Sequence, residues 1–290
     1  PITKEARAAR VGIAKRGLSS LAQFDRAKFS AAQRASASML AWQLDDIVRG
    51  EAFADYEFVF HQMRGLQTSL VNFLSQTHPI RHARDIENYL ARLALVAPQL
   101  DEGIAQARDR ASRGILPPKF ILTATIDQIG RFLSDEAARN VLVVSLDERI
   151  GKLNDFPAPL RTRSVGSAER VVRAQIIPAF ERVRLLLQEQ LPRATDAAGL
   201  SRLPGGNEAY ANALRRNTTT LMTAEEIHAL GLKEVARIEA QMDAILRELG
   251  YADGTVNAHS ANTRAPRRMD ARSRATPHSC GDSSCGARGD

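Results

Sequence analysis

The stretch from Leu203 to Gly250 constrains the fold most strongly, because it contains a turn, a helix stop and a well-specified helix in succession. Leu203-Pro204-Gly205-Gly206 predicts a tight turn, since glycine and proline favour turn positions. Thr223 with Glu226 three residues later is a capping-box pattern, which starts a helix. Apolar residues then follow at helical spacing as far as Gly250. We expect this apolar stripe to be buried: Ile227, Leu230, Val235, Ile238, Met242, Ile245 and Leu249.

The same helical periodicity dominates the rest of the chain. It predicts helices over residues 3–22, 30–48, 66–75, 83–96, 117–133 and 167–191. Pro98 leaves two alternatives open, a kinked continuation of the preceding helix or the start of a new helix that ends before Gly114. Pro178 lies inside the last of these helices and predicts a kink there.

Two short segments are less typical of a helical protein. The run VLVV at residues 141–144 is β-branched, but it is short and solitary, so a buried helix turn is favoured over a strand. Residues 152–163 contain Pro157 and Pro159, and we expect a loop there. The predicted fold class is therefore all-α, an irregular multi-helix array.

Composition supports a folded, water-exposed helical protein. Hydrophobic residues make up 44% and charged residues 25% of the 290 residues, which is enough for a substantial core. No apolar run approaches the roughly 20 residues that a membrane-spanning helix needs. The net charge is +7, but basic and acidic residues are interleaved along the helices, which favours a solvated surface over nucleic-acid binding. We therefore expect neither a membrane span nor a nucleic-acid partner.

The character of the sequence changes after Tyr251. Residues 252–290 contain no Leu, Ile, Phe or Trp, so they cannot bury enough apolar area to offset the entropy of ordering. We expect a disordered tail and hypothesise that it is an aberrant, out-of-frame continuation. The domain organisation predicted is a helical portion over residues 1–251 and this tail over 252–290. Both cysteines lie in the tail, so either the periplasm or the cytoplasm is compatible with the sequence.

Few residues in the chain suggest chemistry. His78 and His82 have the spacing of a helical zinc pair, but Pro79 follows His78 and no third ligand is evident, so ordinary loop histidines are favoured over a metal site. His228, one turn inside the long helix, is more typical of a packed structural residue than of a catalytic one. The backbone amides of Gly205 and Gly206 could bind a substrate carboxylate or peptide, although a plain interhelix turn is the default. No catalytic and no metal-binding residue is predicted.

Several motifs occur together in a characteristic order. They are FHQMRG at residues 60–65, NFL at 72–74 with His78-Pro79-Ile80, ENYLARL at 87–93, GILPP at 114–118, LPGG at 203–206 with Tyr210, and Thr218-Thr219 leading into TAEEIHALG at 223–231. With these motifs, residues 1–251 resemble the bacterial family catalogued as domain of unknown function 885. Each motif alone has low specificity, but the order and spacing of the set are more specific.

The resemblance implies a zinc metallopeptidase-like protein that hydrolyses peptides, with a helical, cleft-bearing, zincin-type architecture. In that family zinc would be held by a His-Glu-x-x-Pro-Gly-His-like helix and a later glutamate, in the second half of the protein. This chain has no His-Glu dipeptide, so no catalytic residue is carried over. We therefore expect an inactive, truncated amino-terminal half that forms one wall of the peptide cleft. The residues expected to face the cleft are Gly205, Gly206 and Tyr210.

Two further expectations follow from this interpretation. A half protein exposes apolar faces, so self-association is expected. The alternative function is a non-catalytic helical binding or scaffold module, and a peptidase assay with a zinc determination distinguishes the two.

Overall fold

The computed structural model describes residues 3–154, 156–251 and 254, and every element in these residues is a helix. The predicted all-α class is therefore confirmed. The described residues divide into two units, one up to Leu221 and one from Met222, which are described separately. The predicted tail lies almost entirely outside the described residues. The short helices of the first unit are η1 (Arg26–Lys28), η2 (Glu51–Tyr56), η3 (Phe73–Thr77), η4 (Ala137–Arg139), η5 (Val172–Ile176), η6 (Leu191–Arg193) and η7 (Leu200–Arg202).

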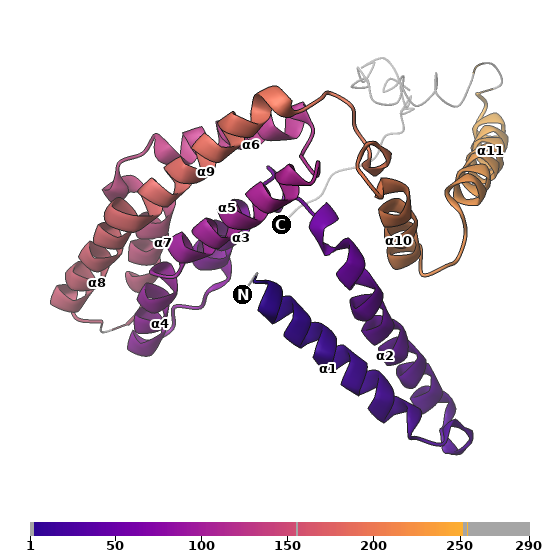
Figure 1. Ribbon diagram of the computed structural model, residues 1–290, viewed down its shortest axis with the longest axis horizontal. Coiled ribbons are helices and arrows are strands. Elements are labelled where there is room, and N and C mark those ends of the chain that lie inside the picture. The colour runs from indigo at the N-terminus through magenta and orange to yellow at the C-terminus, as the bar shows by residue number, and fades with distance from the viewer. Residues whose placement is uncertain (1–2, 155, 252–253, 255–290) are drawn as a thin grey trace, which may run out of the picture. The chain divides into compact units, whose positions relative to one another are not determined.

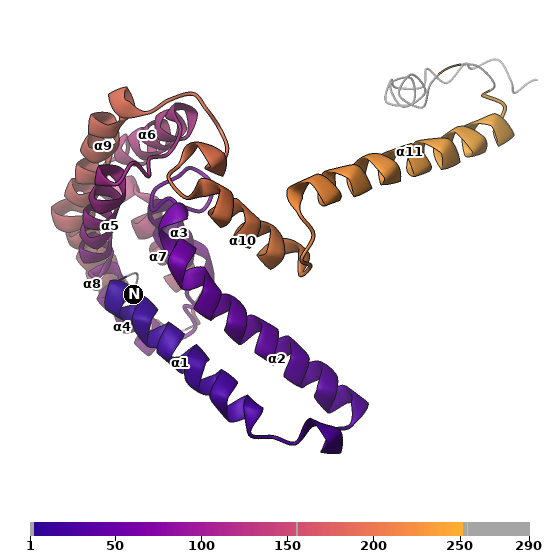
Figure 2. The same ribbon diagram turned by 45° about the vertical axis from the view of Figure 1, so that its right-hand side comes forward.

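The first unit begins with a helical hairpin. α1 (Lys4–Ala22) starts at Thr3, whose hydroxyl accepts from the Ala6 amide, and α2 (Ala31–Gly50) starts at a complete capping box of Ser30 and Gln33. Both views show the two helices side by side, with their connection at the end away from the other helices of this unit (Figures 1 and 2). Only three side chains of these two helices are buried, and all three are small: Val11, Ala14 and Ala37.

The core of the first unit lies among seven further helices. They are α3 (Leu66–Asn72), α4 (Ala83–Leu93), α5 (Val96–Ser112), α6 (Lys119–Leu133), α7 (Val141–Ile150), α8 (Ala158–Val171) and α9 (Ile177–Gln190). α9 packs on both α5 and α6, and α8 packs on both α4 and α7. The Phe132 ring of α6 stacks on the Phe180 ring of α9, with 4.0 Å between the ring centroids. The buried apolar side chains in this part of the unit form one continuous cluster. This cluster supplies most of the hydrophobic stabilisation of the unit.

Proline positions explain where the helices of this core begin. α5 is a new helix with Pro98 in its first turn, which decides between the two alternatives for that residue. The loop predicted over residues 152–163 is wrong in its second half, since α8 begins at Ala158 with Pro159 in the first turn. Proline is tolerated there because first-turn amides have no partner within the helix.

Where a kink is predicted at Pro178, the structure has a π-helical turn just before that residue. Residues Val172–Ile176 form the π-helical turn η5, and α9 starts directly after it with Pro178 at its beginning. Proline lacks the amide that would continue the regular ladder, so the change of register absorbs the missing donor. The run VLVV lies in helix α7, as predicted, and the Asn140 side chain caps that helix through the Leu142 amide.

The first unit ends with α10 (Gly206–Thr218). The threonine run stops this helix, as predicted, and Thr219 adopts a left-handed conformation with φ +57°. A β-branched residue is strained in this region, which favours glycine.

The second unit contains α11 (Ala224–Glu248), which starts at the predicted capping box of Thr223 and Glu226. The predicted burial of its apolar stripe is wrong, because no residue of α11 is buried. Val235 is 53% exposed and Ile245 is 55% exposed. Periodicity predicted the helix and its apolar side correctly, but the described part of this unit offers no second helix to cover that side.

Candidate functional site at the end of helix α5

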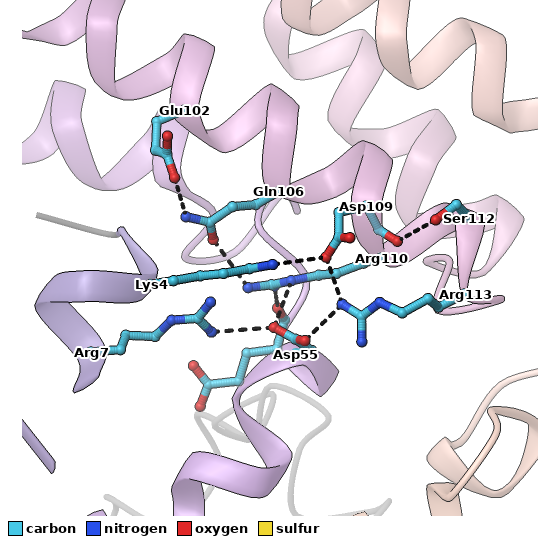
Figure 3. A network of polar contacts seen from close by, with 10 residues as sticks. Lys4, Arg7, Asp55, Glu102, Gln106, Asp109, Arg110, Ser112 and Arg113 are labelled. Atoms are coloured by element: carbon cyan, nitrogen blue, oxygen red, sulfur yellow. Dashed lines mark hydrogen bonds and ion pairs between the residues drawn. The ribbon is translucent and has the colours of Figure 1, made fainter.

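A cluster of charged side chains surrounds Asp55, which lies in η2 (Figure 3). Its carboxylate is 3.2 Å from Arg7 of α1, 3.3 Å from Arg110 Nε of α5 and 2.7 Å from Arg113 just after α5. The carboxylate therefore joins three segments that are distant in the sequence. We call this group, together with Lys4 and Asp109, the Asp55 cluster.

The Asp55 cluster carries more positive than negative charge. Asp109 accepts from Arg113 at 2.8 Å and lies 3.5 Å from Lys4, so two carboxylates face four cations. Burial acts to raise the pKa of Asp55, but hydrogen bonds from Arg113 and Arg7 outweigh it and hold that pKa below its ordinary value. The hydrogen bond from Arg113 likewise lowers the pKa of Asp109.

Arg110 is the buried member of the cluster. Its side chain is only 8% exposed, and burial lowers its pKa. It donates to the backbone carbonyl of Glu57 and to the Gln106 side chain, in addition to its pairing with Asp55. A buried charge is stable only when it is paired and hydrogen-bonded, and Arg110 meets both conditions.

The residues next to Asp55 and Arg113 in the sequence contact the LPGG turn. Tyr56, next to Asp55, donates its hydroxyl hydrogen to the Pro204 carbonyl. Gly114, next to Arg113, has φ +81°, and a Cβ at this residue would lie 3.5 Å from the Pro204 ring. Arg202 donates to the Leu116 carbonyl. η2 and the end of α5 thus support both the Asp55 cluster and the turn.

Of the three residues predicted to face a substrate, Gly205 and Gly206 lie in this turn and Tyr210 lies in the helix that follows it. A Cβ at Gly205 would lie 2.5 Å from the Tyr56 hydroxyl, and a Cβ at Gly206 would lie 1.7 Å from the Leu200 carbonyl oxygen. The Gly206 amide donates to the Leu203 carbonyl, so it serves the turn. Tyr210, one turn into α10, is 47% exposed. Sterics therefore explain both glycines, and a role in substrate binding stays a prediction.

His78 and His82, for which ordinary loop positions are predicted, have different surroundings. His82 lies 3.6 Å from Asp85 with a 61% exposed side chain, whereas His78 is buried at 2% exposure. No group of three or more His, Cys, Asp or Glu side chains in the described part of the chain could hold a metal ion. His228 is exposed, so the packed role predicted for it is wrong.

The burial of His78 was not foreseen from the sequence. Its ring meets the edges of Phe73 and Tyr89, with centroid distances of 6.0 and 5.4 Å, and neither ring nitrogen has a hydrogen-bond partner among the described residues. Arg149 ties this segment to α7 by donating to the carbonyls of His78 and Leu74. Burial and the charge of Arg92 lower the pKa of His78, against opposing effects of the Pro79 backbone and Asp85.

The Asp55 cluster was also missed by sequence reasoning. Its one local signal is Asp55 within AFADYEFVF, one of two carboxylates, with Glu57, in a segment that is otherwise apolar and aromatic. The spacing of Arg110 and Arg113 places both on neighbouring positions of a helix, but nothing in the sequence pairs them with Asp55.

Comparison with known proteins gives the chain a family. Residues 1–279 match the family described as "Bacterial protein of unknown function (DUF885)". The chain belongs to the DUF885 family. The match includes residues 252–279, beyond the residue at which the resemblance noted above ends. No curated protein matches the chain.

A solved structure shares the fold of this DUF885 chain. It is described as "The crystal structure of the putative lipoprotein from Colwellia psychrerythraea", with a TM-score of 0.80 and 22% sequence identity. The similarity covers 91% of this chain and 46% of the other, so the chain spans about half the length of that protein. At this identity the likeness concerns the fold alone. No helix in the described residues is long and apolar enough to cross a membrane.

Proposed function

We propose that this DUF885 chain supplies a peptide-binding wall of a metallopeptidase-like protein and does not hydrolyse peptides by itself. The observation that carries the proposal is the common support of the LPGG turn and the positively charged Asp55 cluster by η2 and the end of α5. The resemblance implies zinc for the intact family. The described residues do not fit that ion, because they contain no suitable ligand group, and we derive no step through it.

The chemistry of the cluster suits a peptide carboxylate. Arg113 has a 46% exposed and Arg7 a 25% exposed side chain, and each guanidinium has five N–H donors, of which the contacts with Asp55 and Asp109 occupy only some. Charge-assisted hydrogen bonds to a carboxylate are strong and directional. In this proposal Tyr210 provides an exposed aromatic surface for peptide side chains, while Gly205 and Gly206 keep the turn in place.

Peptide binding is tested with a fluorescent peptide library that carries free or amidated carboxyl ends. We expect the free carboxylate to bind more tightly, and Tyr210→Ala to weaken binding by about tenfold. Phe24→Ala is the matched control, because Phe24 is also an exposed aromatic residue but lies at the hairpin connection. Equal binding of both peptide forms, or equal loss in both variants, would contradict the proposal.

Activity is tested separately by zinc determination and a peptidase assay on the same preparation. Stoichiometric zinc together with peptide hydrolysis would refute the inactivity of this chain. The alternative is a helical binding or scaffold module without peptidase ancestry, for which no preference for a free peptide carboxylate is expected.

Self-association belongs to this proposal as well. Seven large apolar side chains exposed on α11 and at its C-cap support it: Leu230, Leu232, Val235, Ile238, Met242, Ile245 and Leu249. Light scattering of the purified chain distinguishes a monomer from larger species, and a monodisperse monomer would count against it.

A further inference from the structure

The positive charge of this protein is concentrated at one end of the α1–α2 hairpin. Residues 10–40, here called the distal hairpin, contain six basic residues and one acidic residue, a net charge of +5 in a chain of net charge +7. The expectation that basic and acidic residues are interleaved is therefore wrong for this segment. All six basic side chains are exposed: Arg10, Lys15, Arg16, Arg26, Lys28 and Arg34.

These cations are largely uncompensated. Lys28 lies 3.9 Å from Asp25, and the other five make no ion pair in the described residues. Asp25 is itself engaged in the connection between the helices, where it accepts from the Ala27 amide at 3.0 Å. By contrast, Lys4 and Arg7 at the other end of α1 are both paired with carboxylates of the Asp55 cluster. The free positive charge thus lies at the end of the hairpin remote from the core.

Exposed apolar side chains lie among these cations. Phe24 and Ile13 are each 60% exposed, Met39 is 65% exposed and Leu40 is 45% exposed. Phe24 lies at the connection itself, where its ring packs on Phe29 with 6.3 Å between centroids. Burial inside the protein does not explain these side chains, because the hairpin buries only Val11, Ala14 and Ala37.

We propose that the distal hairpin binds the surface of an anionic lipid membrane, with its basic residues at the headgroups and Phe24 inserted at the interface. Basic side chains are attracted to anionic headgroups, and exposed apolar residues beside them enter the boundary of the acyl region. This is peripheral binding and involves no spanning helix.

Two other partners fit the same surface less well. A nucleic acid would use the cations, but three of the four exposed apolar side chains are aliphatic and offer no ring for base stacking. A second copy of the hairpin would bring two surfaces of charge +5 together, which is electrostatically unfavourable.

The test is co-sedimentation of the full chain with phosphatidylcholine vesicles that contain or lack phosphatidylglycerol. We expect binding only to the anionic vesicles, with an affinity that falls as salt is raised. A hairpin variant with Arg16→Gln, Arg26→Gln and Lys28→Gln should bind about a hundredfold more weakly. Phe24→Ser should weaken binding by about tenfold without changing the net charge.

A matched variant separates this site from the overall charge. Arg84→Gln, Arg131→Gln and Arg163→Gln remove the same charge from exposed arginines of α4, α6 and α8 that make no ion pair in the described residues. We expect this variant to keep its vesicle binding. Equal loss in both triple variants, or no binding to anionic vesicles at low salt, would overturn the proposal. Tighter binding to DNA than to vesicles, unaffected by Phe24→Ser, would replace it with a nucleic-acid surface. Circular dichroism confirms that each variant is folded.

Discussion

Helices α9 and α11 have nearly the same spacing of apolar residues, but these residues are buried in α9 and exposed in α11. In α9 the stripe continues from the preceding π-helical turn through Ile176, Phe180, Val183 and Leu187, and each of these side chains is at most 2% exposed. The stripe of α11 runs through Val235, Ile238, Met242 and Ile245 to the C-cap residue Leu249 with the same alternation of three and four residues, and each side chain is at least 39% exposed. Amphipathic spacing therefore predicts a helix with an apolar side, whereas burial of that side requires partner helices such as α5 and α6.

The largest expected difference is in the cost of shortening one apolar side chain in each helix. Phe180→Ala should reduce the free energy of unfolding by about 3–5 kcal/mol, because it leaves a cavity against Phe132. Met242→Ala should change it by less than about 1 kcal/mol, because Met242 is 39% exposed and shortening it leaves no enclosed cavity. Urea unfolding of the full chain followed by circular dichroism measures both. A large cost at Met242 would break the comparison by showing that α11 is packed in solution.

Charged groups allow a second contrast between partly buried and exposed sites. Asp55→Asn should destabilise the chain by about 2 kcal/mol, because it removes the charge that compensates buried Arg110. Asp101→Asn is the control: Asp101 pairs with Arg182 by two hydrogen bonds, but both side chains are nearly half exposed, so a loss below about 1 kcal/mol is expected.

The Asp55 contribution should depend on pH in a defined direction. The folded-state pKa of Asp55 is lowered, so its stabilisation is present above the unfolded-state value of about 3.9 and is lost as the pH falls through the folded-state value. The stability difference between wild type and Asp55→Asn should therefore shrink in acid. A difference that is constant across this range would contradict the assignment of the charge interaction.

The buried His78 should make the stability of the chain depend on pH in a higher range than Asp55 does. Its folded-state pKa is lowered, so the folded protein binds fewer protons than the unfolded chain, and stability should fall as the pH drops below about 6.5. His78→Phe removes this contribution, and its melting temperature should fall less between about pH 8 and about pH 5 than that of the wild type. His228→Gln removes an exposed histidine of α11 as the control. NMR titration of the wild-type imidazole gives an independent measurement, and a His78 that titrates at the ordinary value would contradict the effect of burial.

The smallest expected effect lies at Thr219, between α10 and α11 in the sequence. Thr219→Gly should stabilise the first unit by roughly 1 kcal/mol, because glycine adopts a positive φ without strain. Thr219→Ala keeps the Cβ and should gain less. Thermal unfolding measures the difference, and equal effects of the two substitutions would show that the backbone conformation carries no strain.

Helix starts and stops were largely predictable from the sequence because their causes are local. The capping boxes at Ser30 and Thr223, the left-handed glycine at Gly114 and the stop after Thr218 depend on residues within one helical turn. The start of α8 was missed because proline in a first turn and proline in a loop have the same local sequence. The π-helical turn η5 was expected only as a kink, because a proline inside a helical pattern predicts a disturbance of the backbone hydrogen bonds but not its form.

The candidate site was less predictable, because its causes are not local. The motifs located the LPGG turn, but the Asp55 cluster depends on contacts that join Arg7, Asp55 and Arg113 across the chain. Likewise, His78 was expected in an ordinary loop, and its burial follows from the packing of α4 and α7 around it.

The sequence alone determined the all-helical class, most helix boundaries and the side of each helix that is apolar, because backbone hydrogen bonds, caps and periodicity act within a few residues. The tertiary structure alone decided which apolar sides are buried, which carboxylate the arginines surround and where positive charge stays uncompensated. These properties depend on the free energy of contacts between residues distant in the chain, and α9 and α11 differ for that reason.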